Sequence, residues 1–145
     1  NWGMELAWSA EGAWFRQTLS DTTGFDASTH PVLSFRILPI EGDVLNPPAT
    51  EHDFHIRMTD IDGNWADMPL SAAAQGALRP NPVVGAGTPA KAVYETYRLS
   101  LAAFRAITPT LDMGRLQHIE WRFDGNPTGA LVLDDIVFST DTPCE

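Results

Sequence analysis

Five of the eight arginines in the sequence fall in the middle of predicted strands, at positions that turn toward solvent. Side chains alternate between the two faces of a strand, so the apolar neighbours of each arginine fix its direction. A guanidinium is a planar donor suited to the oxygens of carboxylates and hydroxyls. We therefore predict that these arginines, with nearby outward side chains, contact an oxygen-rich ligand. The candidate contact residues are Trp14, Arg16, Arg36, His55, Arg57, Arg98, His118, Glu120 and Arg122.

The same outward positions allow a second interpretation, in which arginines and acids form ordinary cross-strand ion pairs. Such pairs contribute about 0.2–1 kcal/mol each. Only Glu120 and Asp53 stand at outward positions near the five arginines, so this pairing would be incomplete. Both interpretations stay open from the sequence.

Eight short runs of alternating or β-branched residues predict strands, with Gly, Pro, Asp and Asn between them. Helical periodicity is nearly absent apart from segments 70–78 and 100–107. Asp62-Gly63 is a two-residue hairpin signal, which explains the DIDGN segment better than a calcium-binding loop does. This succession predicts an all-β antiparallel sandwich or barrel. The runs are residues 4–9, 13–19, 32–38, 53–60, 65–70, 94–101, 116–123 and 131–139.

The segment 116–139 contains the two strongest runs, LQHIEWRF and ALVLDDIVF, on either side of a polar turn. We predict that they form an antiparallel strand pair against which the other strands lie. In the second run, Asp134 shares its alternation with Ile136 and Phe138, which points its carboxylate inward. A buried carboxylate requires a cation or several backbone donors.

The chain has 145 residues, enough for one domain with a sizeable core, and we expect residues 1–145 to form a single domain. Because it starts at Asn1 rather than Met, we expect a processed product or a piece of a larger protein. The formal net charge of −10 makes nucleic acid an unsuitable partner. No apolar run approaches the roughly 18 residues of a membrane-spanning helix, and the single cysteine, Cys144, permits no disulfide within the chain.

Five segments carry, in order, a resemblance to a known family: LSFRI, DFHIRMTDIDGNW, YETYRLSLAAF, LDMGRLQHIEWRFD and GALVLDDIVFS. Over about residues 32–139, their succession resembles the galactose-binding-like β-jelly-roll modules. Many carbohydrate-binding modules of bacterial extracellular proteins belong to that group. The resemblance implies a jelly-roll β-sandwich, a polysaccharide or oligosaccharide partner, and a secreted or cell-surface location in a bacterium.

The resemblance also implies that the arginine-bearing strands are neighbours in one sheet. The five arginines, with the two histidines and Glu120, would then line one concave face that binds a polar, even anionic, glycan. Trp14 or Trp65 would supply the aromatic platform on which a sugar ring stacks.

A structural Ca²⁺ is a further implication, because an Asp of the closing strand in such modules often helps to hold one beside the first strand. Carried over to this chain, Asp134 or Asp135 would be a ligand, with Glu5 or Glu11 as its partner and carbonyl oxygens completing the shell. The alternative is that the Asp pair caps backbone amides at a strand end.

Two other classes of function stay open. The sequence has no motif for a catalytic nucleophile, but a jelly-roll lyase would use Arg and His, and Glu120 with Asp53 would form a glycosidase pair. The chain would otherwise be a docking module whose aromatic residues Trp2, Trp8 and Trp65 pack on a partner domain or chain. The long connection at residues 69–92 is predicted to cover a sheet face rather than to carry chemistry.

Overall fold

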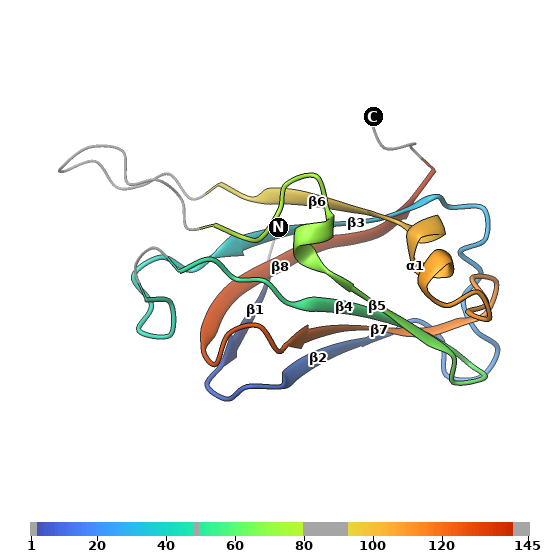
Figure 1. The fold of residues 1–145 in the computed structure, drawn as a ribbon, viewed down its shortest axis with the longest axis horizontal. Coiled ribbons are helices and arrows are strands. Elements are labelled where there is room, and N and C mark those ends of the chain that lie inside the picture. The colour runs from blue at the N-terminus through green and yellow to red at the C-terminus, as the bar shows by residue number, and fades with distance from the viewer. Residues whose placement is uncertain (1–2, 48–49, 80–92, 141–145) are drawn as a thin grey trace.

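The computed structural model describes residues 3–47, 50–79 and 93–140, and these residues form two four-stranded antiparallel sheets. Figure 1 shows them stacked as a sandwich. The predicted all-β antiparallel sandwich is confirmed, and each predicted run gives a strand whose ends shift by at most two residues. In spatial order, sheet A contains β1 (Met4–Trp8), β8 (Gly129–Ser139), β3 (Val32–Pro39) and β6 (Glu95–Ser100), and sheet B contains β2 (Ala13–Thr18), β7 (Leu116–Phe123), β4 (His55–Asp60) and β5 (Trp65–Pro69).

The core lies between the sheets, where the inward side chains of both meet. Phe35 of sheet A stands edge-on to Trp121 of sheet B, with 5.8 Å between the ring centroids. Phe35 also stacks on Tyr97, at 5.9 Å. All three rings are buried, as their alternation predicted, and full burial of a Phe-sized side chain contributes roughly 1.5–3 kcal/mol. These rings fix which face of each strand is left for solvent.

β7 and β8 lie in different sheets, so the predicted strand pair within 116–139 is wrong. The connection between them carries the chain from sheet B to sheet A, at the left of Figure 1. Trp8 packs at this crossing: its ring stacks on Phe123 at 4.1 Å, and its Nε1 donates to the carbonyl of Asn126 at 3.0 Å. Gly129 touches the same ring so closely that a β-carbon would overlap it. Alternation alone does not distinguish strands that face each other across a core from strands that pair.

The open side between edge strands β5 and β6 is partly closed by α1 (Leu101–Ile107), which joins β6 to β7. Phe104 of this helix is buried in the core, and the Thr108 hydroxyl donates to the carbonyl of Trp65 at 2.8 Å. The predicted helix-like segment 100–107 is thus confirmed, and it anchors the start of β5.

The second helix-like segment, 70–78, forms only one 3-10 turn, η1 (Leu70–Ala72). Its alanine-rich continuation bends at Gly76, whose φ of 75° is incompatible with a right-handed helix. In the long connection 69–92, residues 80–92 lie outside the described part of the chain. The predicted role of this connection in covering a sheet face therefore stays a prediction.

A β-bulge at Asp135 reverses the alternation along β8. The register with β3 shifts there, and Asp135 has a φ of 49°. Leu133 is buried before the bulge, whereas Ile136 packs against the core after it. Asp134 therefore faces outward beside Arg36, its register partner, and the prediction that it points inward is wrong.

Candidate functional site

The outward face of sheet B carries three rows of side chains that run across its strands. In each row, the register aligns one residue from β2, β7, β4 and β5. The central row is Arg16, Glu120, Arg57 and Asp67; the first row is Trp14, Arg122, His55 and Pro69; the third row is Thr18, His118, Thr59 and Trp65. Seven of the nine predicted contact residues therefore share one face.

The central row consists of alternating charges joined by short hydrogen bonds. Arg16 donates to Glu120 Oε1 from Nε at 2.9 Å and from Nη2 at 2.6 Å. Arg57 holds Asp67 with both ends of its fork, Nε to Oδ1 at 2.6 Å and Nη2 to Oδ2 at 2.7 Å. Arg122 adds a longer contact to Glu120 Oε2 at 3.4 Å. The guanidinium groups of this face are thus already bound to carboxylates.

The protonation states of these groups follow from their contacts. Glu120 is only 4% exposed. Burial raises its pKa, but the interactions with Arg16, His118 and Arg122 together outweigh burial, and its pKa lies below the ordinary value. The hydrogen bond to Asp67 raises the pKa of Arg57. Burial, followed by the charge of Arg16, lowers the pKa of His118. At neutral pH Glu120 and Arg57 are therefore ionised and lie near a neutral His118 imidazole.

Two exposed tryptophans stand at opposite corners of this face. Trp14, at the β2 end of the first row, is 56% exposed, and Trp65, at the β5 end of the third row, is 48% exposed. The guanidinium carbon of Arg16 lies 5.0 Å from the ring centroid of Trp14, and that of Arg57 lies 3.8 Å from Trp65. Both aromatic candidates from the sequence are available to a ligand.

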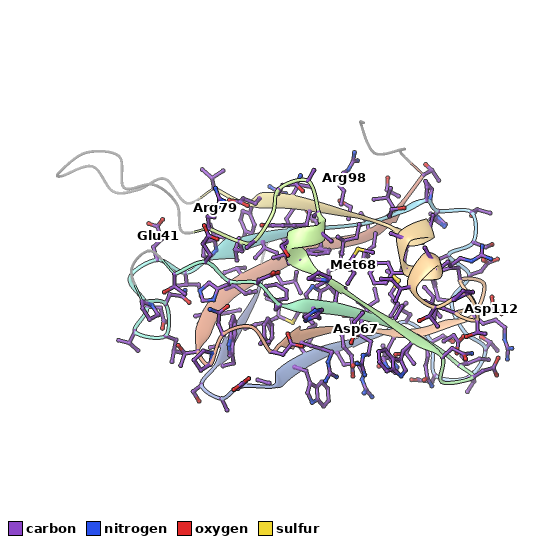
Figure 2. The ribbon with its side chains drawn as sticks, viewed as in Figure 1. Glu41, Asp67, Met68, Arg79, Arg98 and Asp112 are labelled. Atoms are coloured by element: carbon purple, nitrogen blue, oxygen red, sulfur yellow. The ribbon has the colours of Figure 1, made fainter. Side chains whose placement is uncertain are left out.

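The prediction that all five arginines share one face is wrong. Arg36 on β3 and Arg98 on β6 belong to sheet A, and in Figure 2 Arg98 projects from β6 on the side of the molecule away from β2. Arg36 donates to Asp135 at 2.7 Å and lies over the ring of Tyr94. Alternation tells inward from outward on each strand, but sheet membership depends on connections between distant segments.

Sequence reasoning missed the acids that complete the site. Asp67 is the partner of Arg57, and Asp124 contacts His55 Nδ1 at 2.9 Å. The turn signal in the sequence misplaces Asp67: a two-residue turn at Asp62-Gly63 would set Met68 opposite Arg57, whereas the observed register sets Asp67 there. The incomplete pairing expected from the sequence is therefore largely made up by these acids.

The residues predicted to hold calcium do not form a metal site in the described part of the chain. Within residues 3–47, 50–79 and 93–140, no three His, Cys, Asp or Glu side chains are grouped to hold an ion. Glu5 is exposed on β1 opposite Val132, and Asp135 is bound to Arg36. The Asp135 amide donates to Asp134 Oδ1 at 2.8 Å, which is the capping role named as the alternative. The described residues therefore give calcium binding by Glu5, Asp134 and Asp135 no support, and it stays a prediction.

The DIDGN segment forms a hairpin turn as predicted, but the loop has three residues, 61–63, rather than two, with Gly63 at a φ of 83°. The amide of Gly63 donates to the carbonyl of Asp60 at 3.1 Å. The buried Asp60 carboxylate accepts from the amides of Asp62, Asn64 and Asp112 and from the Asn64 side chain, at 2.9–3.0 Å. Its hydrogen-bonding capacity is used by the protein itself, so the segment is structural.

Glu120 and Asp53 are not arranged as a glycosidase pair. Arg57 is the register partner of Glu120, and Asp53 lies four residues before Arg57, which corresponds to about 13 Å of extended chain. Glycosidase carboxyl groups lie roughly 5–9.5 Å apart. Asp53 moreover accepts hydrogen bonds from the amide and hydroxyl of Ser71.

No protein-family model matches the sequence, and no curated protein matches it either. The described residues include no helix long and apolar enough to span a membrane.

Solved structures do resemble the chain. One is the family 30 carbohydrate-binding module of the Clostridium thermocellum cellulosomal cellulase Cel9D-Cel44B, with a TM-score of 0.63 and 13% identity over 97% of this chain and 76% of that one. Another is the family 11 carbohydrate-binding module of Clostridium thermocellum in complex with a β-1,3-1,4-mixed-linked tetrasaccharide, with a TM-score of 0.55 and 18% identity over 97% of this chain and 78% of that one. The predicted resemblance is confirmed at the level of the fold: the chain shares the jelly-roll β-sandwich of these carbohydrate-binding modules.

Proposed function

We propose that this domain binds carbohydrate on the outward face of sheet B and does not act on it chemically. The observation that carries the proposal is one solvent-facing sheet that combines two exposed tryptophans, Trp14 and Trp65, with a fixed row of polar side chains. A sugar ring has an apolar C–H face that packs on an aromatic ring. Its hydroxyl groups both donate and accept, which matches a row of guanidinium groups and carboxylates.

The pairing of the central row favours a neutral glycan over a uronate. A ligand carboxylate that took Arg57 would displace Asp67 and leave that carboxylate without its partner, which is costly in a partly buried site. A hydroxyl group accepts from one member of a pair and donates to the other without separating them. The anionic ligand considered from the sequence is thus the less suitable one.

The structural neighbours support a carbohydrate partner. The family 11 module binds a mixed-linked tetrasaccharide, and the family 30 module belongs to a cellulosomal cellulase. As part of the same proposal, this chain is extracellular and is attached to a partner domain.

The proposal is tested with a matched pair of arginine variants. Arg57 and Arg36 both lie in mid-strand and are both paired with an aspartate, but on opposite sheets. Calorimetric titration would compare wild type, Arg57→Ala and Arg36→Ala on mixed-linked β-glucan and on a polyuronate. We expect wild type and Arg36→Ala to bind the glucan equally, and Arg57→Ala to bind about tenfold more weakly, a loss of about 1.4 kcal/mol.

Two results would contradict the proposal. One is the absence of binding to every neutral and anionic polymer tested with folded wild-type protein. The other is an equal loss in the two variants, which would separate binding from the face of sheet B. Binding only to the polyuronate, lost in Arg57→Ala, would keep the face but replace the neutral ligand with an anionic one.

A further inference from the structure

The two exposed tryptophans define one diagonal across the outward face of sheet B. From Trp14 the first row crosses three strand spacings to Pro69 on β5, and Trp65 lies four residues away along β5. Strand spacings of about 4.8 Å and rises of about 3.4 Å per residue place the two α-carbons about 20 Å apart. The line between them passes over Glu120 and Arg57, at the centre of the central row.

The other diagonal of the face has no such pair of anchors. It runs from Thr18, at the β2 end of the third row, to Pro69, at the β5 end of the first row. Its ends therefore offer a hydroxyl group and a small aliphatic ring, which contribute less contact area than tryptophan. Only the diagonal from Trp14 to Trp65 thus has an aromatic ring at each end, although both diagonals cross the polar residues of the central row.

Both tryptophan rings are held in place before a ligand arrives. Arg57 stacks on Trp65 and is itself fixed by two hydrogen bonds to Asp67. Arg16 lies over Trp14 and is fixed by two hydrogen bonds to Glu120. Each ring has an arginine over it, yet Trp14 is 56% and Trp65 48% exposed, so ring surface remains for a ligand. Rings fixed in this way lose little side-chain freedom on binding.

Resting on the proposed carbohydrate-binding function, we infer that the ligand is an extended glycan chain that lies along the diagonal from Trp14 to Trp65. Sugars toward its two ends stack on the tryptophans, and the sugars between them contact Glu120 and Arg57. A span of about 20 Å requires several sugars in a row. Any internal stretch of a polymer meets this requirement, so a chain end is not needed.

The inference is tested by the dependence of affinity on ligand length. Calorimetry would use β-1,3-1,4-linked glucan oligosaccharides from disaccharide to hexasaccharide, the linkage seen with the family 11 module. The proteins are wild type, Trp14→Ala, Trp65→Ala and, as a control on the same face but off the diagonal, Thr18→Ala. For wild type and Thr18→Ala we expect a sharp gain in affinity once the ligand spans both tryptophans.

In each alanine variant of a tryptophan this gain should disappear. The longest oligosaccharide should bind about tenfold more weakly, whereas the disaccharide, which reaches only one ring, should lose at most about twofold. Trp14→Phe and Trp65→Phe retain an aromatic surface and should keep most of the gain. Thermal melting of each variant shows that it remains folded.

The outcomes separate this inference from the proposed function. If only one tryptophan matters, or if both variants weaken short and long ligands by the same factor, the diagonal is refuted while carbohydrate binding stands. If folded wild type binds none of the oligosaccharides and no glucan polymer, the proposed function fails, and the diagonal with it.

Discussion

Replacement of Asp60 by alanine is expected to be among the most destabilising single changes in this domain. Asp60 ends β4, is 0% exposed and accepts four hydrogen bonds. Two come from Asn64 and one from Asp62 within the β4–β5 turn, and the fourth comes from Asp112, in the segment that leads into β7. One carboxylate thus fixes the turn and ties it to a segment 52 residues away.

The magnitude follows from the donors that the variant leaves without a partner. A hydrogen bond to a charged group contributes about 1.5–3 kcal/mol, and an unsatisfied buried donor costs about 1–3 kcal/mol. Asp62 and Asp112 are exposed residues, so water replaces part of the loss at their amides. We therefore expect Asp60→Ala to lower the free energy of unfolding by about 3 kcal/mol and the melting temperature by roughly 10 °C.

The effect should depend on pH in a defined direction. Burial raises the pKa of Asp60, but the hydrogen bonds from Asp112, Asn64 and Asp62 together outweigh burial, and the pKa lies below its ordinary value. The ionised carboxylate therefore stabilises the fold above the unfolded value of about 3.9. That contribution is lost as the pH falls through the lower, folded value, so the difference between wild type and Asp60→Ala should shrink below about pH 4.

Urea unfolding followed by circular dichroism, at neutral pH and near pH 3, measures both effects. Asp62→Ala is the matched control, because Asp62 lies in the same turn but pairs with Arg115 at the surface, a contact worth about 0–1 kcal/mol. Equal destabilisation by the two variants at neutral pH would show that the network around Asp60 does not stabilise the turn as described.

Three further predictions follow from single residues. His52 is 3% exposed, and its pKa is lowered chiefly by burial. Wild type should therefore lose stability relative to His52→Gln as the pH falls below about 6.5, by at most about 1.4 kcal/mol per pH unit. Urea-stability curves that stay parallel for the two proteins would contradict this. Asp135→Val should lower the free energy of unfolding by about 1–2 kcal/mol more than Asp135→Asn does, because φ is 49° at this position and a β-branched residue is strained there. Equal urea midpoints for the two variants would argue against the bulge. Because no cluster of three potential ligands is found around Glu5, Asp134 and Asp135 in the described part of the chain, we expect EDTA to leave the melting temperature unchanged. A drop that added Ca²⁺ restores would assign calcium to this chain after all.

The strands and their inward faces could be predicted because both are local properties. Period-two alternation fixed the directions of Phe35, Tyr97 and Trp121, and Gly, Pro, Asp and Asn marked the turns between strands. The distribution of strands between the sheets could not be predicted in this way. It depends on the crossing after β7, where Trp8 from the start of the chain packs against Gly129, a contact between residues far apart in the sequence.

In the candidate site, too, local features could be predicted from the sequence and contacts between distant segments could not. Outward positions on β2, β4 and β7 were correctly assigned, but Arg36 and Arg98 were placed on the wrong sheet because their strands were assumed to be neighbours. Asp134 was turned the wrong way by a single extra residue, since a β-bulge inverts every later position of its strand. The one local hint of that bulge is that Asp tolerates a left-handed backbone better than most residues.

The alternating charges of the central row have a consequence for the conditions under which the domain works. Arg16 and Arg57 cancel Glu120 and Asp67 at the surface itself, although the whole chain carries a formal charge of −10. Dissolved ions screen attractions that act beyond about 10 Å at 0.1 M salt, and a neutralised row exerts little force at that range. We therefore expect the affinity of the proposed binding to a neutral glycan to change little between dilute buffer and 0.1 M salt.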